Sequence, residues 1–318
     1  MTFDLDAYVT EIVFDNAGPA FALGDGAVAW TDAAATAAHD GAILCAAAHP
    51  SGDGVVTGGD DGRLIWSRRG GVQELAVVKR RWIDAVATSP VSGLIAFASG
   101  REAQVLDAND GAFARRFSHP ASISALTFDP KGRRLAAATY GGAALWYARI
   151  ADQTPVMLRW AGSHIAVAFS PDGKFLISSM QEGALHGWRL SDAMDMRMGG
   201  YPSKARSLAF IAKGAWLATS GAQGVVVWPF GGSQGPMGKQ AMELGYDQTA
   251  VVTRVAGGPS TSVFCAGLND GRVWACDLEN QAVTPIKAER GAAISALAME
   301  KGVIAWGDES GGAGVLGV

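Results

Sequence analysis

Apolar positions along the 318-residue chain occur in short runs, several of which alternate with polar positions, and turn residues separate them. Such alternation is typical of half-buried β-strands, and no segment keeps the 3.6-residue period of an amphipathic helix over a useful length. The turns include Asp61–Gly62 and Asp270–Gly271, a residue pair that suits tight hairpins. The pattern therefore predicts an all-β protein.

One unit recurs about every forty residues: an apolar strand, a turn, a strand of small residues, a second turn, and a strand that ends in a large apolar residue. We number eight copies of this unit: residues 9–30, 43–66, 83–106, 123–146, 164–188, 205–228, 251–276 and 294–316. Their anchor residues at the end of the third strand are Trp30, Trp66, Leu106, Trp146, Trp188, Trp228, Cys276 and Leu316. Roughly ten residues after each anchor leave room for a fourth strand.

Four-stranded units of this length are typical of the blades of a β-propeller. We therefore predict a single propeller domain over residues 1–318 with eight blades; seven blades, with one copy used differently, is the alternative. The last copy shows only three strands. We expect residues 1–5, with Phe3 and Leu5 on one strand face, to supply its fourth strand and so close the ring.

The segments Asp60–Trp66 (DDGRLIW) and Ser170–Gly173 (SPDG), together with the recurrent strand-end tryptophan, resemble WD40 repeats over essentially the whole chain. The resemblance implies a hydrogen-bonded polar cluster in copy 2, formed by His39, Thr57, Asp60 and Trp66. In copy 4 it implies a reduced cluster of His119, Thr139 and Trp146, whereas the other copies keep only the tryptophan. The Trp-Asp dipeptide of the family is absent from every copy.

Composition narrows the class further. The chain is 18% charged, with a net charge of −4 and three cysteines. It has no apolar run long enough for a membrane helix, and its acidic start lacks the features of a signal peptide. These features predict a globular cytoplasmic protein with free thiols, no membrane association and, at a pI of 5.7, no main role in nucleic-acid binding.

Charge is segregated along the chain. Residues 79–230, the basic arc, contain 17 Lys and Arg against 10 Asp and Glu, whereas residues 1–78 contain 3 against 11. Segregation of this size steers and orients a charged partner. Uneven scatter of surface charge and association of two copies of the chain are the alternatives.

In WD40 propellers, the loops before first strands and between second and third strands lie on one face. On the basic arc these loops combine Arg and Lys with aromatic residues, a composition typical of binding hot spots. The candidate partner-binding residues are Arg80, Arg81, Trp82, Arg101, Tyr140, Arg159, Trp160, Lys204 and Arg206. We predict a protein or peptide partner at this face, and the charge of the arc suits an acidic one.

No catalytic constellation and no metal-ligand spacing emerges from the sequence, so we expect no cofactor, no metal and no enzymatic activity. The main hypothesis is a non-enzymatic scaffold. The alternative is a propeller enzyme or small-ligand binder with its site at the channel mouth. The acids repeated in second turns, Asp25, Asp60, Asp270 and Asp308, are the candidates for that site. The oligomeric state is left open.

Overall fold

The computed structural model describes residues 1–317. Its regular structure consists of strands β1 to β30 and one short 3-10 helix, η1 (Ala212–Gly214), which confirms the predicted all-β class. No helix in this range has the length and apolar character that a membrane span requires. The chain forms two compact units: unit I (Thr10–Val167) and unit II (Met1–Val9 with the chain from Ala168 on).

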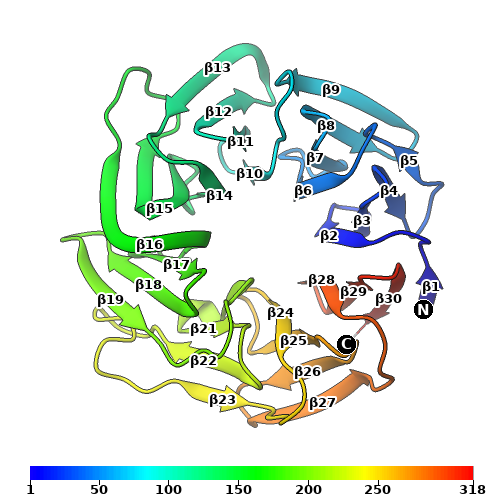
Figure 1. Cartoon of the computed structure of the whole chain (residues 1–318), viewed down its shortest axis with the longest axis vertical. Helices are drawn as coiled ribbons and strands as arrows, with labels where there is room; N and C mark the ends of the chain where they lie inside the picture. Colours follow the sequence, from blue (N-terminus) through cyan, green and yellow to red (C-terminus); the bar gives the residue numbers. More distant parts are fainter. Residues whose placement is uncertain (318) are drawn as a thin grey trace. The chain divides into compact units, whose positions relative to one another are not determined.

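Unit I begins with three four-stranded antiparallel sheets that correspond to copies 1, 2 and 3, and in each the strand order follows the chain (Figure 1). Their strands are β2 (Val9–Phe14), β3 (Pro19–Leu23), β4 (Ala27–Trp30), β5 (Thr36–Ala37), β6 (Ile43–Ala48), β7 (Val55–Gly59), β8 (Arg63–Arg68), β9 (Gly71–Val77), β10 (Ala85–Ser89), β11 (Leu94–Ser99), β12 (Glu102–Asp107) and β13 (Asp110–Ser118).

Second strands of the copies are buried along their whole length, as in β7 and β11. A strand in this position is covered on both faces, so small side chains are needed where the neighbouring sheet approaches closely. In β11, Ala96 and Ala98 lie in one core cluster with Phe128 and Trp146 of copy 4. The small-residue strands recognised in the sequence, such as β7 and β11, are therefore completely buried strands of unit I.

Copies 4 and 5 share one sheet of six strands, in the order β14-β15-β16-β17-β18-β19. Its first three strands are β14 (Ile123–Phe128), β15 (Arg134–Tyr147) and β16 (Val156–Phe169). The first half of β15 pairs with β14. Its second half, from Tyr140 on, pairs with β16, with a register shift between Tyr140 and Gly142. Gly141 and Gly142 both have positive φ where the partner changes.

This continuity changes the blade count. Residues 1–317 form seven hydrogen-bonded sheets, so the prediction of eight separate blades is wrong and the alternative of seven holds. The lower number does not arise because one copy is used differently. Each of the eight copies supplies strands, but β15 and β16 are each 14 residues long and join copies 4 and 5 into one sheet.

Unit II contains the remaining strands of copy 5 and the sheets of copies 6, 7 and 8, again antiparallel. The strands are β17 (Phe175–Met180), β18 (Ala184–Arg189), β19 (Met194–Met198), β20 (Leu208–Ile211), β21 (Trp216–Thr219), β22 (Val225–Pro229), β23 (Met242–Leu244), β24 (Val252–Ala256), β25 (Val263–Leu268), β26 (Val273–Asp277), β27 (Ala282–Lys287), β28 (Ile294–Glu300), β29 (Val303–Asp308) and β30 (Gly312–Gly317).

The first residues of the chain complete the last sheet, as predicted. Strand β1 (Thr2–Asp4) pairs antiparallel with β30, with Phe3 opposite Ala313 (Figure 1). The Leu5 N–H donates to the Gly311 carbonyl at 2.9 Å. The edge that β30 would otherwise expose is thereby paired, which removes a template for aggregation.

Candidate functional site

The loop of residues 79–82, between β9 and β10, carries the densest group of candidate binding residues. Both of its ends are hydrogen-bonded to copy 2: the Val78 N–H donates to the Gly62 carbonyl at 2.7 Å, and the Ile83 N–H donates to the Gly59 carbonyl at 3.0 Å. Between these two anchors the side chains point outward, and Trp82 is 64% exposed. An indole this exposed adds little to the core.

The turn between β7 and β8, which contains Gly62, packs closely against the main chain of this loop. Gly62 has φ of +78°, and a Cβ at this position would lie 2.3 Å from the Val78 carbonyl oxygen and 2.5 Å from that of Arg81. Only glycine tolerates both the backbone conformation and the approach. Gly62 therefore helps to set the main-chain position of Arg81.

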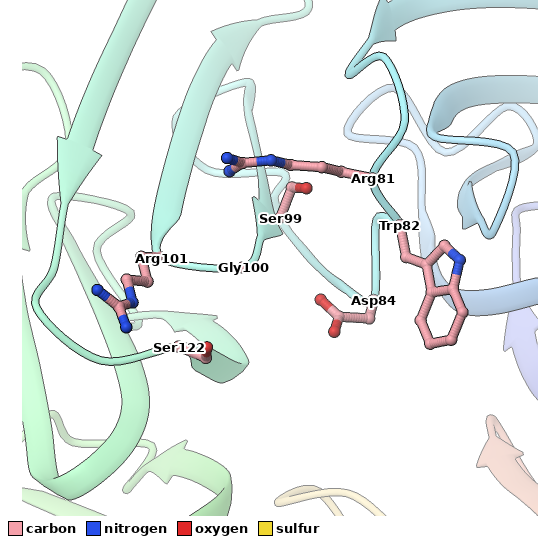
Figure 2. Close-up of a pocket in the computed structure, with 7 residues that line it drawn as sticks. All are labelled: Arg81, Trp82, Asp84, Ser99, Gly100, Arg101 and Ser122. Atoms are coloured by element: carbon pink, nitrogen blue, oxygen red, sulfur yellow. The ribbon is translucent and has the colours of Figure 1, made fainter.

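A pocket of about 610 Å³ opens beside the loop, and it is built entirely within unit I. Three segments form its walls: the loop before β10, the turn between β11 and β12, and the loop before β14. Figure 2 shows the seven lining residues, which are Arg81, Trp82, Asp84, Ser99, Gly100, Arg101 and Ser122.

Two arginines provide the positive charge of this pocket. Arg81 reaches across the hollow over Gly100, and an ideal Cβ on that glycine would lie 3.9 Å from Nη1 of Arg81 (Figure 2). Arg101 stands at the opposite side from Trp82. Within residues 1–317, neither arginine forms an ion pair. Their guanidinium groups are thus available to an anionic ligand.

The same pocket contains two polar groups that the sequence did not single out. The Asp84 carboxyl points into the hollow, and partial burial raises its pKa above the ordinary value (Figure 2). Ser99 is only 2% exposed, and its hydroxyl has no hydrogen-bond partner among the described residues. A buried hydroxyl without a partner is costly.

The other candidate residues lie elsewhere. Arg80 belongs to the same loop, with φ of +60°, but does not line the pocket. Tyr140 is 71% exposed, and Arg159 lies opposite Gly142 where β15 pairs with β16. Trp160 follows Arg159 and is half-buried. The structure thus brings together Arg81, Trp82 and Arg101 out of the predicted set.

Lys204 and Arg206 belong to unit II. Lys204 Nζ donates to Gln181 Oε1 at 3.1 Å, and the Arg206 side chain is exposed. Neither is part of the pocket in unit I, and their role in partner binding stays a prediction.

The polar cluster of copy 2 differs from the expected one in its acid. His39 Nε2 lies 2.8 Å from Thr57 Oγ1, and His39 Nδ1 lies 3.0 Å from Asp61 Oδ1. The acid is therefore Asp61 rather than Asp60. The carboxyl group of Asp60 lies against Gly41 instead, where an added Cβ would meet its oxygen.

Trp66 also lies outside this cluster. Its indole N–H donates to the Asp53 carbonyl at 2.7 Å, and its ring stacks on His49 with centroids 3.9 Å apart. Because the indole faces the turn that contains Asp53, it cannot reach Thr57. The expected contact of Trp66 with the cluster is corrected accordingly.

In copy 4 the expected cluster does not form. Ile123 pairs with Thr139 as Ile43 pairs with Gly59, so Thr139 occupies the position of Gly59 rather than that of Thr57. Thr139 Oγ1 donates to the Gly142 carbonyl. Nε2 of His119 consequently has no hydrogen-bond partner in residues 1–317.

Copy 6 contains a polar cluster that the sequence comparison missed. The Tyr201 hydroxyl lies 2.6 Å from Thr219 Oγ1 and accepts the Trp228 indole N–H at 2.7 Å. Burial raises the pKa of Tyr201 to about 12. The spacing of the residues could have indicated this cluster. Tyr201 stands four residues before the buried Ala205, just as His39 stands four residues before Ile43.

The second-turn acids act locally. Asp25 accepts the Ala27 N–H, Asp308 accepts the N–H groups of Ser310 and Gly312, and Asp270 pairs with Arg272. Such bonds are typical of Asx turns. No group of three potential metal-ligating side chains occurs in the described part of the chain.

A comparison with known protein families supports the repeat pattern in copy 2. The family model described as "WD domain, G-beta repeat" matches residues 33–66, which include copy 2 and its His39 cluster. The predicted resemblance to the WD40 family is thereby confirmed.

Solved structures show the fold of this chain. The computationally designed Ika8 protein superposes with a TM-score of 0.79 at 20% identity, over 99% of this chain and 98% of that one. The Cps50 (Swd1) β-propeller domain of Myceliophteria thermophila gives 0.68 at 14% identity, over 87% and 97%. At these identities the likeness establishes the fold alone, a WD40-type β-propeller. No curated protein matches the chain.

Proposed function

We propose that this chain is a non-enzymatic WD40 scaffold that binds an acidic segment of a protein or peptide at the pocket of unit I. WD40 propellers typically serve as protein-interaction scaffolds. The observation that carries the proposal is the pair of arginines without ion pairs, Arg81 and Arg101, on either side of a hollow that also presents the exposed indole of Trp82.

Other arginines of the basic arc support the choice of these two. Arg134, Arg149 and Arg189 each pair with a nearby aspartate at 3.0 Å or less. Those charges are already compensated within the protein. An arginine left unpaired beside an aromatic side chain is instead the combination found at the energetic centres of interfaces. Arg81 and Arg101 differ from these three because they form no ion pair within residues 1–317 and because they line the pocket beside Trp82.

The test uses fluorescein-labelled poly-L-glutamate as the acidic polypeptide, with binding measured by fluorescence anisotropy. The double variant Arg81→Glu/Arg101→Glu should bind at least about tenfold more weakly than the wild type, because it replaces two attractions with two repulsions. Its melting temperature should be unchanged, since both side chains are exposed.

A matched control makes the same change of charge in unit I. Lys131 and Arg133 are exposed and lie beyond the C-terminal end of β14, whereas the pocket lies at the N-terminal end of that strand. Lys131→Glu/Arg133→Glu should leave the affinity within about twofold. Equal losses in the two double variants, or no binding by the wild type, would overturn the proposed function.

A further inference from the structure

Asp84 stands in a place that an anion-binding site alone does not explain. Its carboxyl group points into the hollow between two arginines, yet it forms no ion pair within residues 1–317. A carboxylate here repels any purely anionic ligand. The group is useful only if the ligand also presents a hydrogen-bond donor, because an ionised carboxylate can only accept.

The remaining lining residues define where such a ligand would lie. Gly100 has no side chain, so a ligand can approach the turn between β11 and β12 closely. Ser99 lies in the wall of the pocket, and its buried hydroxyl has no hydrogen-bond partner among the described residues. Trp82 offers an apolar face on the side opposite Arg101 (Figure 2). Donors, an acceptor and an apolar surface thus surround one hollow of about 610 Å³.

An acidic residue inside a polypeptide matches this arrangement. It carries one carboxylate, a main-chain N–H a few bonds away, and a short apolar stem. A free inorganic anion lacks the N–H, and a phosphoryl group carries up to two negative charges, which Asp84 would repel more strongly.

We propose that the pocket recognises a single glutamate or aspartate of the partner by two of its groups at once. Arg81 and Arg101 bind the side-chain carboxylate, and Asp84 accepts the main-chain N–H of the same residue. Ser99 donates its hydroxyl to the carboxylate, and Trp82 packs against the stem. This inference rests on the proposed function and adds the chemical identity of the residue that the pocket selects.

The experiment uses four short probes of the form acetyl-Gly-Gly-X-Gly-Gly-amide, where X is Glu, Gln, N-methyl-Glu or phosphoserine. Binding is followed by NMR on the ten tryptophan indole N–H signals, with Trp82→Phe used to assign the signal of Trp82. The Glu probe should bind at least about tenfold more tightly than the Gln probe, which lacks the charge. It should also bind more tightly than the N-methyl-Glu probe, which lacks only the N–H, and more tightly than phosphoserine.

Two variants of Asp84 separate acceptance of a hydrogen bond from repulsion. Asp84→Asn keeps an acceptor oxygen and should still discriminate against the N-methyl-Glu probe. Asp84→Ala removes the acceptor, so it should bind the Glu probe about tenfold more weakly and bind the two probes equally. Thermal melting checks that both variants are folded.

Tighter binding of the Glu probe by Asp84→Ala would show that Asp84 only repels, and would overturn the inference. So would equal affinity of the wild type for the Glu and N-methyl-Glu probes, tighter binding of phosphoserine, or no binding of the Glu probe. None of these results depends on poly-L-glutamate or on the arginine variants. The proposed function is therefore tested separately from this inference.

Discussion

Copies 2 and 3 build the same part of the repeat in opposite ways. His39 stands four residues before the buried Ile43, and Lys79 stands four residues before the buried Ile83. In copy 2 the imidazole is buried and bonded on both nitrogens, so the loop is pinned to the sheet. In copy 3 the lysine is exposed, and the ends of the loop are held by main-chain bonds of Val78 and Ile83.

Strand register shows why the two arrangements exclude each other. Cys45 pairs with Gly58 and Ala85 pairs with Ala98, so Gly59 of copy 2 corresponds to Ser99 of copy 3. A Cβ on Gly59 would lie 2.4 Å from His39 Nδ1, so the buried histidine needs a glycine there. Copy 3 lacks the histidine and can carry a serine.

The difference teaches how one repeat serves two purposes. Copy 2 satisfies its buried polar groups internally and is thereby stabilised. Copy 3 leaves Ser99 without a partner and exposes Arg81 and Trp82 around a pocket. Loops held by a rigid scaffold but not closed on themselves are where binding residues concentrate. Copy 3 therefore presents an open pocket where copy 2 has a closed polar cluster.

The largest effect on stability should come from breaking the closed copy. His39→Ala leaves Thr57 and Asp61 without their imidazole partner and should lower the free energy of unfolding by about 2–3 kcal/mol. The corresponding change in copy 3, Lys79→Ala, should cost less than about 0.5 kcal/mol. Urea denaturation measures both. Similar losses at the two positions would contradict the distinction between the copies.

A second change tests the contact that joins the two copies. Gly62→Ala should cost about 2 kcal/mol, because its Cβ would press on the carbonyl oxygens of Val78 and Arg81 and because φ is positive. Displacement of the Arg81 main chain should also weaken binding of poly-L-glutamate severalfold.

Gly70→Ala is the matched control for that change. Gly70 also has a positive φ, of +85°, but nothing lies within 4 Å of an added Cβ. Gly70→Ala should therefore lower the free energy of unfolding by only about 1 kcal/mol, the cost of a positive φ for alanine, and it should leave binding of poly-L-glutamate intact. If Gly70→Ala impaired binding as much as Gly62→Ala, the positioning role of Gly62 would be refuted.

The smallest effect concerns which acid belongs to the cluster. Partial burial opposes ionisation of Asp61, but hydrogen bonds from the Arg63 N–H and His39 outweigh it and lower the pKa of the carboxyl. Asp61→Asn should cost about 1 kcal/mol at neutral pH, whereas Asp60→Asn should be within about 0.5 kcal/mol of the wild type.

The pH dependence of the Asp61 contribution follows from the direction of its shift. A pKa lowered by folding stabilises the native state above the unfolded value of about 3.9, and this stabilisation is lost as pH falls through the folded value. The gap in unfolding free energy between the wild type and Asp61→Asn should therefore narrow below about pH 4. A gap that stayed constant down to pH 2 would argue against an ionised Asp61 in the cluster.

Local pattern alone was enough to predict the strands, the repeat and the N-terminal contribution to the last sheet. These signals are local. Alternating polarity, Asp-Gly turns and strand-end residues such as Trp66 and Trp146 can each be recognised within a single copy of the repeat. The pairing of β1 with β30 was predictable because an incomplete sheet leaves an edge that must be covered, whereas its register, with Phe3 opposite Ala313, was not predicted.

The candidate site was predictable only in its exposed members. Arg81, Trp82 and Arg101 stood out because charge and aromatic side chains in loops are visible in a sequence. Asp84 and Ser99 were missed, since nothing in their neighbours says that the Asp84 carboxyl enters a hollow or that the Ser99 hydroxyl lacks a partner.

By itself, then, the sequence determined that this chain is an all-β repeat protein with a basic stretch over residues 79–230. Only the tertiary structure decided that copies 4 and 5 share a sheet and that Asp61 rather than Asp60 bonds His39. It also decided that Arg81, Trp82 and Arg101 surround one pocket. The physical reason is that strand type follows from local periodicity, whereas sheet continuity, hydrogen-bond partners and pockets depend on register and on residues far apart in the chain.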